Sequence, residues 1–108
     1  MIVLVSAFLG LAAASPETAA ARTAWTRCTD GLYPQAEAGV RPATAADSIL
    51  DYCKPQHDAW VAAALRDIDR GSRTARQKAA ARTAVRNRDN GVRARLIRLI
   101  TQDRRHNR

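Results

Sequence analysis

Histidine and cysteine are scarce in this 108-residue chain, which holds two of each. A structural zinc site needs about four ligands, and only His57 lies near Cys53 in the sequence. No G-x-S-x-G or H-E-x-x-H signature and no glycine-rich phosphate loop is present. His57 has carboxylate neighbours such as Asp58, but we interpret it as an ordinary helix residue. The sequence therefore predicts a protein that is not an enzyme and that binds no metal ion or cofactor.

The chain also lacks the alternation of apolar and polar residues that is typical of strands. Alanine, arginine, leucine and glutamine favour helices, and alanine and arginine are abundant here. We expect an all-α fold, in which a signal peptide precedes a disulfide-linked helical hairpin and a basic amphipathic C-terminal helix. Only 5% of the residues are aromatic, so the core is small and a covalent link would help to stabilise it.

One long apolar run is present, at the start of the chain, where residues 1–14 read MIVLVSAFLGLAAA. An apolar run that ends in small residues is typical of a signal peptide, with cleavage here after Ala14 or as late as Ala21. The usual basic n-region is missing, so either the true start lies upstream of Met1 or the signal is atypical. A membrane anchor and a core helix are the alternatives to a signal peptide. A transmembrane helix needs about 20 apolar residues, and the run at residues 1–14 is shorter than that. We expect a periplasmic or secreted protein with no transmembrane span in its mature form.

Cys28 and Cys53 are the most specific chemical feature of the sequence. An even number of cysteines in an exported chain predicts a disulfide, and two cysteines allow one intramolecular pairing. Closing the loop of 26 residues between them is worth roughly 3.5 kcal/mol on the chain-entropy model. Free thiols and a redox or metal site are the alternatives, although the C-x-x-C spacing is absent. We expect Trp25, Tyr52 and Trp60 to form an aromatic core around the disulfide.

Local sequence signals predict a helical hairpin over residues 15–70, with two helices joined by a loop. The first helix is expected at residues 16–30, with Ser15 as its N-cap and Gly31 as its end. Residues 31–43 hold two glycines and two prolines and are expected to form a loop. Apolar residues keep helical spacing through Pro55, so we expect one kinked helix from 44 to 70.

The C-terminal part of the chain carries the excess positive charge. Residues 71–108 contain twelve Arg or Lys and two Asp, whereas residues 1–70 contain six Arg or Lys and eight Asp or Glu. We expect a basic amphipathic segment at 71–102, with a break at Asn90–Gly91, and a disordered tail at 103–108. The predicted anion-binding residues are Arg73, Arg76, Lys78, Arg82, Arg86, Arg88, Arg93, Arg95 and Arg98.

Three kinds of partner fit this segment. An anionic envelope surface, of lipid headgroups or acidic polysaccharide, fits a basic amphipathic helix. An acidic partner protein could receive its apolar residues as anchors in a groove. Nucleic acid is disfavoured by the compartment and by the lack of an aromatic residue for base stacking. In a fourth interpretation, the apolar residues pack on the hairpin of the same chain; they are Val85, Val92, Leu96 and Leu99.

We therefore predict a non-enzymatic exported protein that binds an anionic envelope component or an acidic protein. The alternative is an intracellular nucleic-acid-binding protein in which residues 1–14 form a core or anchor helix. Salt-dependent binding of duplex DNA would favour this alternative.

The spacing W-x-x-C at Trp25–Cys28 and the run ADSILDYC that ends at Cys53 resemble those of small exported proteobacterial proteins of unknown function. The similarity covers roughly residues 24–65. It implies a signal peptide followed by a disulfide-stapled helical hairpin, and it implies no activity. The layout is also similar to that of small helical periplasmic inhibitor proteins of the lysozyme-inhibitor type.

Overall fold

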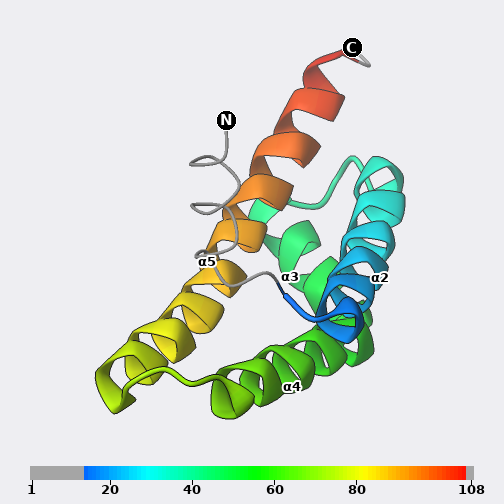
Figure 1. Ribbon diagram of the computed structural model, residues 1–108. Coiled ribbons are helices and arrows are strands. Elements are labelled where there is room, and N and C mark those ends of the chain that lie inside the picture. The colour runs from blue at the N-terminus through cyan, green and yellow to red at the C-terminus, as the bar shows by residue number, and fades with distance from the viewer. Residues whose placement is uncertain (1–13, 107–108) are drawn as a thin grey trace, which may run out of the picture.

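The computed structural model describes residues 14–106 of the chain (Figure 1). The predicted signal peptide lies outside this range except for Ala14. Within it, the chain forms four α-helices, one short 3-10 helix and no strand, so the all-α prediction is confirmed. In chain order the elements are α2 (Pro16–Leu32), η1 (Tyr33–Gln35), α3 (Pro42–Tyr52), α4 (Lys54–Arg70) and α5 (Ala75–His106).

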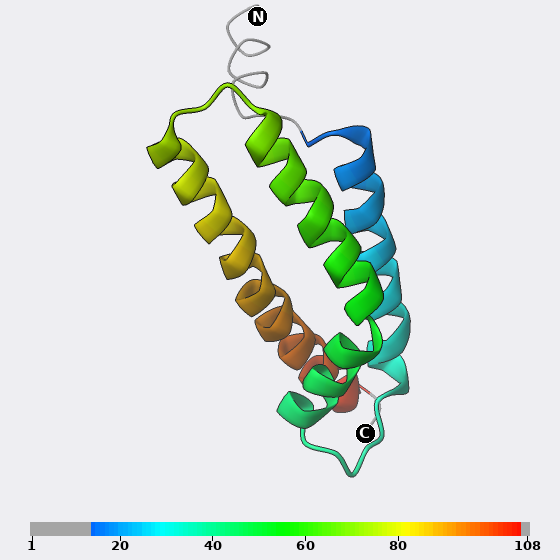
Figure 2. The ribbon, with the colours of Figure 1, turned by 90° about the horizontal axis from the view of Figure 1, so that it is seen from below.

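Three long helices give the molecule its shape. Helices α2, α4 and α5 run lengthwise in Figure 2, and α4 is antiparallel to both α2 and α5. Helix α2 packs mainly on α4, whereas α3 packs mainly on α5. In Figure 1, α3 lies between α2 and α5, and the core forms where these helices meet α4.

Helix α2 begins as the sequence predicts. The Ser15 side chain accepts a hydrogen bond from the Thr18 N–H at 3.3 Å, and Pro16 occupies the first helical position. The prediction that Gly31 ends the helix is wrong, because the helix continues to Leu32. A glycine ends a helix by adopting a left-handed conformation, and Gly31 does not adopt one.

The predicted single helix over 44–70 is wrong, because the structure has two helices that meet at Cys53. Cys53 has φ −89° and ψ 12°, outside regular helical geometry. Pro55 has no N–H to donate to Asp51, and its ring would clash with that carbonyl in a continuous helix. At the second position of α4 the same proline leaves no bond unmade. The break lets α3 turn away from α4 and lie on α5 (Figure 1).

Helix α5 is longer and more continuous than predicted. The expected break at Asn90–Gly91 is wrong, because both residues lie inside the helix. A glycine costs a helix only about 1 kcal/mol, and Leu96 and Ile100, both buried, hold the following turns. The predicted disorder of 103–108 is wrong for 103–106, which are helical, and residues 107–108 lie outside the described range. Here the Arg104 guanidinium donates a hydrogen bond to the Glu37 carbonyl at 2.6 Å.

Replacing Gly91 with alanine is expected to raise the free energy of unfolding by about 1 kcal/mol. Gly91 lies inside α5 in a right-handed conformation, and a β-carbon there would meet no atom within 4 Å. Urea unfolding measures the gain. Gly39→Ala is the control, since Gly39 has equal space but lies outside the helices. A loss of stability in Gly91→Ala would contradict a continuous helix at this position and would favour the break that the sequence predicts at Asn90–Gly91.

The core is small and is built around two tryptophans. The rings of Trp25 and Trp60 stack with their centres 5.3 Å apart. Their buried neighbours in the core are Ala45, Ala46, Ile49, Cys53, Ala64, Leu96 and Ile100. The prediction that Tyr52 belongs to this core is wrong, because its side chain is 73% exposed. Ile49 and Cys53 take the buried positions on that side of α3, and Tyr52 is left on the surface.

Candidate functional site

The predicted disulfide is confirmed. Cys28 and Cys53 are joined, with their α-carbons 5.9 Å apart. The bond fastens α2 to the junction of α3 and α4, and Cys53 is completely buried. The described part of the chain has no free cysteine. The bond therefore acts as a structural link between the two halves of the predicted hairpin.

His57 is more highly connected than the sequence predicts. Its Nδ1 lies 2.9 Å from an Asp58 oxygen, and its Nε2 lies 2.8 Å from an Asp89 oxygen. Its ring also meets the Trp25 ring edge-on at 5.0 Å. Asp58 is adjacent in sequence, but Asp89 is 32 residues away in α5, so local spacing could not reveal it. His57 thus ties α4 to α5, and the described residues contain no cluster of three or more side chains that could hold a metal ion.

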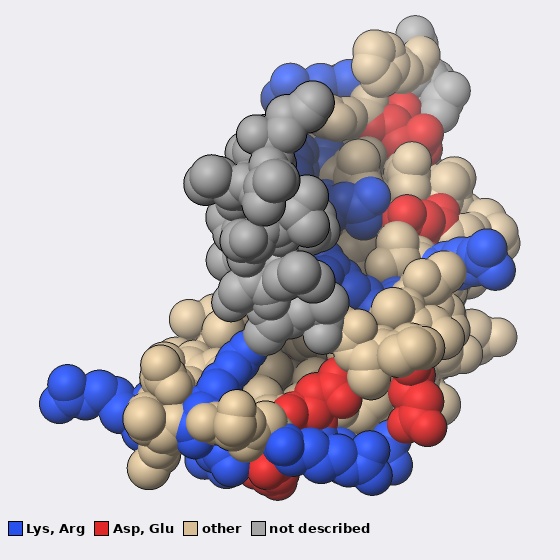
Figure 3. Space-filling model, viewed as in Figure 1, with Lys and Arg blue, Asp and Glu red and all other residues tan. Residues whose placement is uncertain are grey.

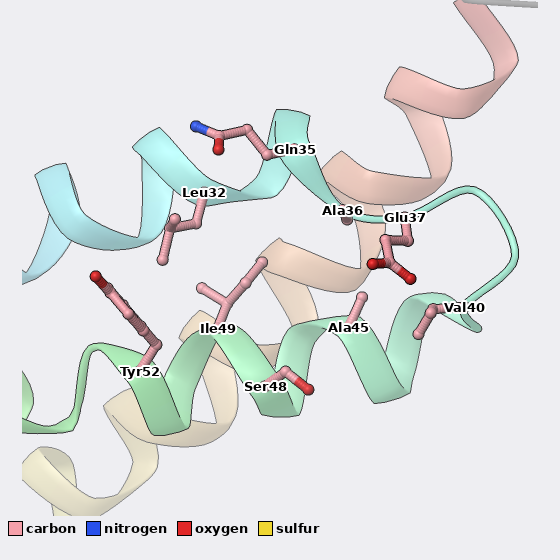
Figure 4. A pocket seen from close by; sticks show the side chains of 9 residues that line it. All are labelled: Leu32, Gln35, Ala36, Glu37, Val40, Ala45, Ser48, Ile49 and Tyr52. Atoms are coloured by element: carbon pink, nitrogen blue, oxygen red, sulfur yellow. The ribbon is translucent and has the colours of Figure 1, made fainter.

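A surface groove of about 460 Å³ lies between η1 and α3 (Figure 4). Tyr52 points toward Leu32 across it, and Glu37 is its one charged side chain. The remaining lining residues are Gln35, Ala36, Val40, Ala45, Ser48 and Ile49. This lining offers no histidine, cysteine, lysine or arginine.

The structure divides the nine predicted anion-binding residues into two groups. Arg93 and Arg95 lie beside the core and are paired with acidic residues. The Arg93 Nε donates to Asp47 at 2.7 Å, and the Arg95 Nη1 donates to Asp30 at 2.8 Å. Each hydrogen bond raises the pKa of its guanidinium further above its ordinary value. These two ion pairs therefore connect α5 to α3 and to α2. Because Arg93 and Arg95 are paired in this way, they are less available to bind an external anion.

The other group extends from Arg73, in the turn between α4 and α5, along α5 as far as Arg98. Two of its members hold this turn: Arg82 pairs with the Asp69 carboxylate at 2.8 Å, and Lys78 donates to the Asp69 carbonyl at 3.1 Å. The described residues contain no ion pair to the remaining arginines of the nine, and all of these are exposed. They are Arg73, Arg76, Arg86, Arg88 and Arg98.

Arg22 in α2 adds a positive charge beside Arg88 of α5. The pKa of Arg88 is lowered, first by desolvation and second by the positive charge of Arg22. Two guanidinium groups that repel each other in this way favour an anion nearby. Arg22 carries no local sequence signal for this role, because its proximity to Arg88 arises only from the packing of distant parts of the chain.

The apolar residues of α5 are used inside the protein. Leu96 and Ile100 are completely buried, and Val85 and Val92 pack against the core. Leu99 is half-buried. Leu96, Val85 and Val92 therefore pack on the chain's own hairpin, as one interpretation expected, whereas Leu99 is not among the residues packed against the core. The three packed residues are not free to serve as anchors in the groove of an acidic partner protein.

Asp67 anchors the start of α2, a role that the sequence does not reveal. Its Oδ2 accepts hydrogen bonds from the Thr18 hydroxyl at 2.6 Å and from the Ser15 main-chain N–H at 3.0 Å. The Thr18 bond, and next the Ser15 bond, lower the pKa of the Asp67 carboxyl. In the same way, the hydrogen bond from Arg93 lowers the pKa of Asp47.

Acidification below about pH 4 is expected to destabilise the fold in part through Asp67. The folded pKa of this carboxyl lies below its unfolded value of about 3.9, so its contribution is complete above that value. The contribution is lost as the pH falls through the folded pKa. Urea unfolding at pH 7 and pH 3 measures the loss, which should be smaller in Asp67→Asn. An equal loss in both proteins would contradict this role.

Comparison of the chain with known protein families, with characterised proteins and with solved structures finds no match. The resemblance of residues 24–65 to exported proteobacterial proteins therefore stays a prediction. Within residues 14–106, no helix combines the length and the apolar character that a membrane span requires.

Proposed function

We propose that this protein is exported to the cell envelope and binds an anionic lipid surface through the basic end of the molecule. We define the basic end as the α4–α5 turn with the first half of α5, residues 70–88. Export is supported by the leader-like composition of residues 1–14 and by the disulfide, a bond that persists mainly in oxidising compartments.

The observation that carries the proposal is the one-sided charge of the basic end. Residues 70–88 include seven Arg or Lys and no Asp or Glu. None of their side chains is completely buried, so this half of α5 adds little to the core. In Figure 3, the corner where α5 begins carries basic side chains and no acidic ones. A core function does not explain such a segment, whereas attraction to an anionic surface does.

The distribution of the charges favours an extended surface over a small anion. Arg76 and Arg86 are ten residues apart, about 15 Å along a helix. A single phosphate in a pocket would not contact both. The buried apolar face of α5 also argues against insertion of this helix into the hydrocarbon layer. We therefore expect peripheral, salt-sensitive binding that rests on charge.

The test compares two variants of equal net charge. Replacing Arg73, Arg76 and Arg86 with glutamine removes three exposed charges from the basic end. Each charge near an anionic membrane is worth about 1 kcal/mol, so we expect roughly 100-fold weaker binding to phosphatidylglycerol vesicles. Cosedimentation with vesicles at low and at physiological salt measures the affinity.

The control variant carries Arg27→Gln, Arg41→Gln and Arg105→Gln, which are exposed positions outside the basic end. Charges further from the membrane than the Debye length of about 10 Å are screened, so we expect a much smaller loss. Equal losses in the two variants would contradict a role for this particular surface. Equal binding to neutral phosphatidylcholine vesicles, or tighter binding to duplex DNA than to vesicles, would overturn the proposal.

A further inference from the structure

The end of the molecule opposite the disulfide holds a network that links the start of α2 to α4. The Ser15 nitrogen lies 3.0 Å and the Thr18 hydroxyl 2.6 Å from the same oxygen of Asp67. The hydroxyl groups of Ser15 and Thr18 are 3.0 Å apart. Thr18 is only 5% exposed, so this network is part of the packed structure.

The network distinguishes the two cleavage sites that the sequence allows. Ala14 is exposed and lies outside α2, so a cut after it leaves the whole helix and the network in place. A cut after Ala21 would fall inside α2 and would remove both Ser15 and Thr18. Asp67 would then lose the two groups whose hydrogen bonds lower its pKa.

We propose that the peptide bond between Ala14 and Ser15 is the processing site, and that the new amino terminus of Ser15 docks on the Asp67 carboxylate. A signal peptidase hydrolyses the bond with one water, which gives a carboxylate on Ala14 and an α-ammonium group on Ser15. The inference rests on the export proposed above. No oxidant, metal ion or further reactant is needed.

Hydrolysis changes the chemistry of the Ser15 nitrogen at this position. The neutral amide N–H becomes a cationic donor, and its hydrogen bond to Asp67 becomes an ion pair. A positive charge at the start of a helix is unfavourable because of the helix dipole. Asp67, together with Glu17 in the first turn of α2, places negative charge there to offset it. The mature terminus would thus be a structural element that joins α2 to α4.

The first experiment expresses the full chain in a bacterium and isolates it from the periplasm. Intact mass and N-terminal sequencing are expected to show a chain that begins at Ser15 and is lighter by two hydrogens for the disulfide. A chain that begins at Arg22, or at any other residue, would overturn this site and leave export intact. Full-length protein confined to the cytoplasm would overturn the export on which the inference rests.

The second experiment tests docking on the processed protein. An α-amino group titrates near pH 8, so the ion pair with Asp67 is present at pH 6 and absent at pH 9.5. The Tm difference between the original protein and Asp67→Asn should therefore be smaller at pH 9.5 than at pH 6. Asp69→Asn is the control, because its partner Arg82 stays charged at both pH values. A Tm difference for Asp67→Asn that does not change with pH would overturn the docking.

Discussion

Replacing both Cys28 and Cys53 with alanine is expected to lower the free energy of unfolding by roughly 3.5 kcal/mol, the chain-entropy value for their loop of 26 residues. The disulfide holds α2 against the junction of α3 and α4, where Pro55 interrupts the helix. Without it, the unfolded chain gains freedom while the folded chain loses its one covalent link between these elements. Alanine is preferred to serine, because a hydroxyl at the buried position of Cys53 would add a desolvation cost.

Thermal unfolding monitored by circular dichroism measures this effect. A loss of 1 kcal/mol lowers the Tm of a domain of this size by about 4–8 °C, so the Tm should fall by roughly 14–28 °C. Reduction of the original protein with dithiothreitol should give a similar fall. Tyr52→Ala, next to Cys53 but 73% exposed, should change stability by less than about 0.5 kcal/mol. An unchanged Tm in the double alanine variant would mean that packing alone holds α2.

The helices were predictable where their signals are local. The cap at Ser15 and the end of α4 near Arg70 depend on a few neighbouring residues, and the structure agrees with the sequence at both places. The errors arose where a local signal competes with packing. Gly91 lies in a helix because the turns after it are buried, and apolar spacing through Pro55 concealed a break that lets α3 reach α5.

The sequence predicts which residues supply the positive charge of the candidate site. It does not predict which of these residues form ion pairs inside the protein. The sequence shows that arginine is concentrated in α5, and it cannot show which arginines meet an aspartate. Arg93 finds Asp47 and Arg95 finds Asp30 across separations of 46 and 65 residues. These pairings depend on the arrangement of three helices, which no local sequence pattern shows. The exposed charges of the basic end were distinguishable only after the paired ones were identified.

The pairings also distinguish the two halves of α5. The second half of α5 is held by Leu96 and Ile100, which are buried, and by the ion pairs of Arg93 and Arg95. The first half is held more lightly, through Asp89 at His57 and through Arg82 at Asp69. The fold therefore presents the basic end on a helix whose other end is fixed in the core.

Replacing Trp25 with alanine is expected to lower the free energy of unfolding by about 3–5 kcal/mol, the usual cost of removing a buried tryptophan. Its ring is 3% exposed, stacks on Trp60 and meets His57 edge-on, so it joins α2 to two positions of α4. The loss would also free His57, and with it the bond to Asp89 in α5.

Urea unfolding with the disulfide intact, together with near-ultraviolet circular dichroism, tests the role of Trp25. Trp25→Phe keeps an aromatic ring against Trp60 and should lose less stability than Trp25→Ala. Equal losses in the two variants would show that an aromatic ring at this position contributes nothing to stability, and would contradict the role of the Trp25 ring contacts. Because Trp25 lies one helical turn before Cys28, the effects of removing the ring and the disulfide should not add. Coupling between them would show that the aromatic pair and the covalent link stabilise one shared unit, on which the position of α5 depends.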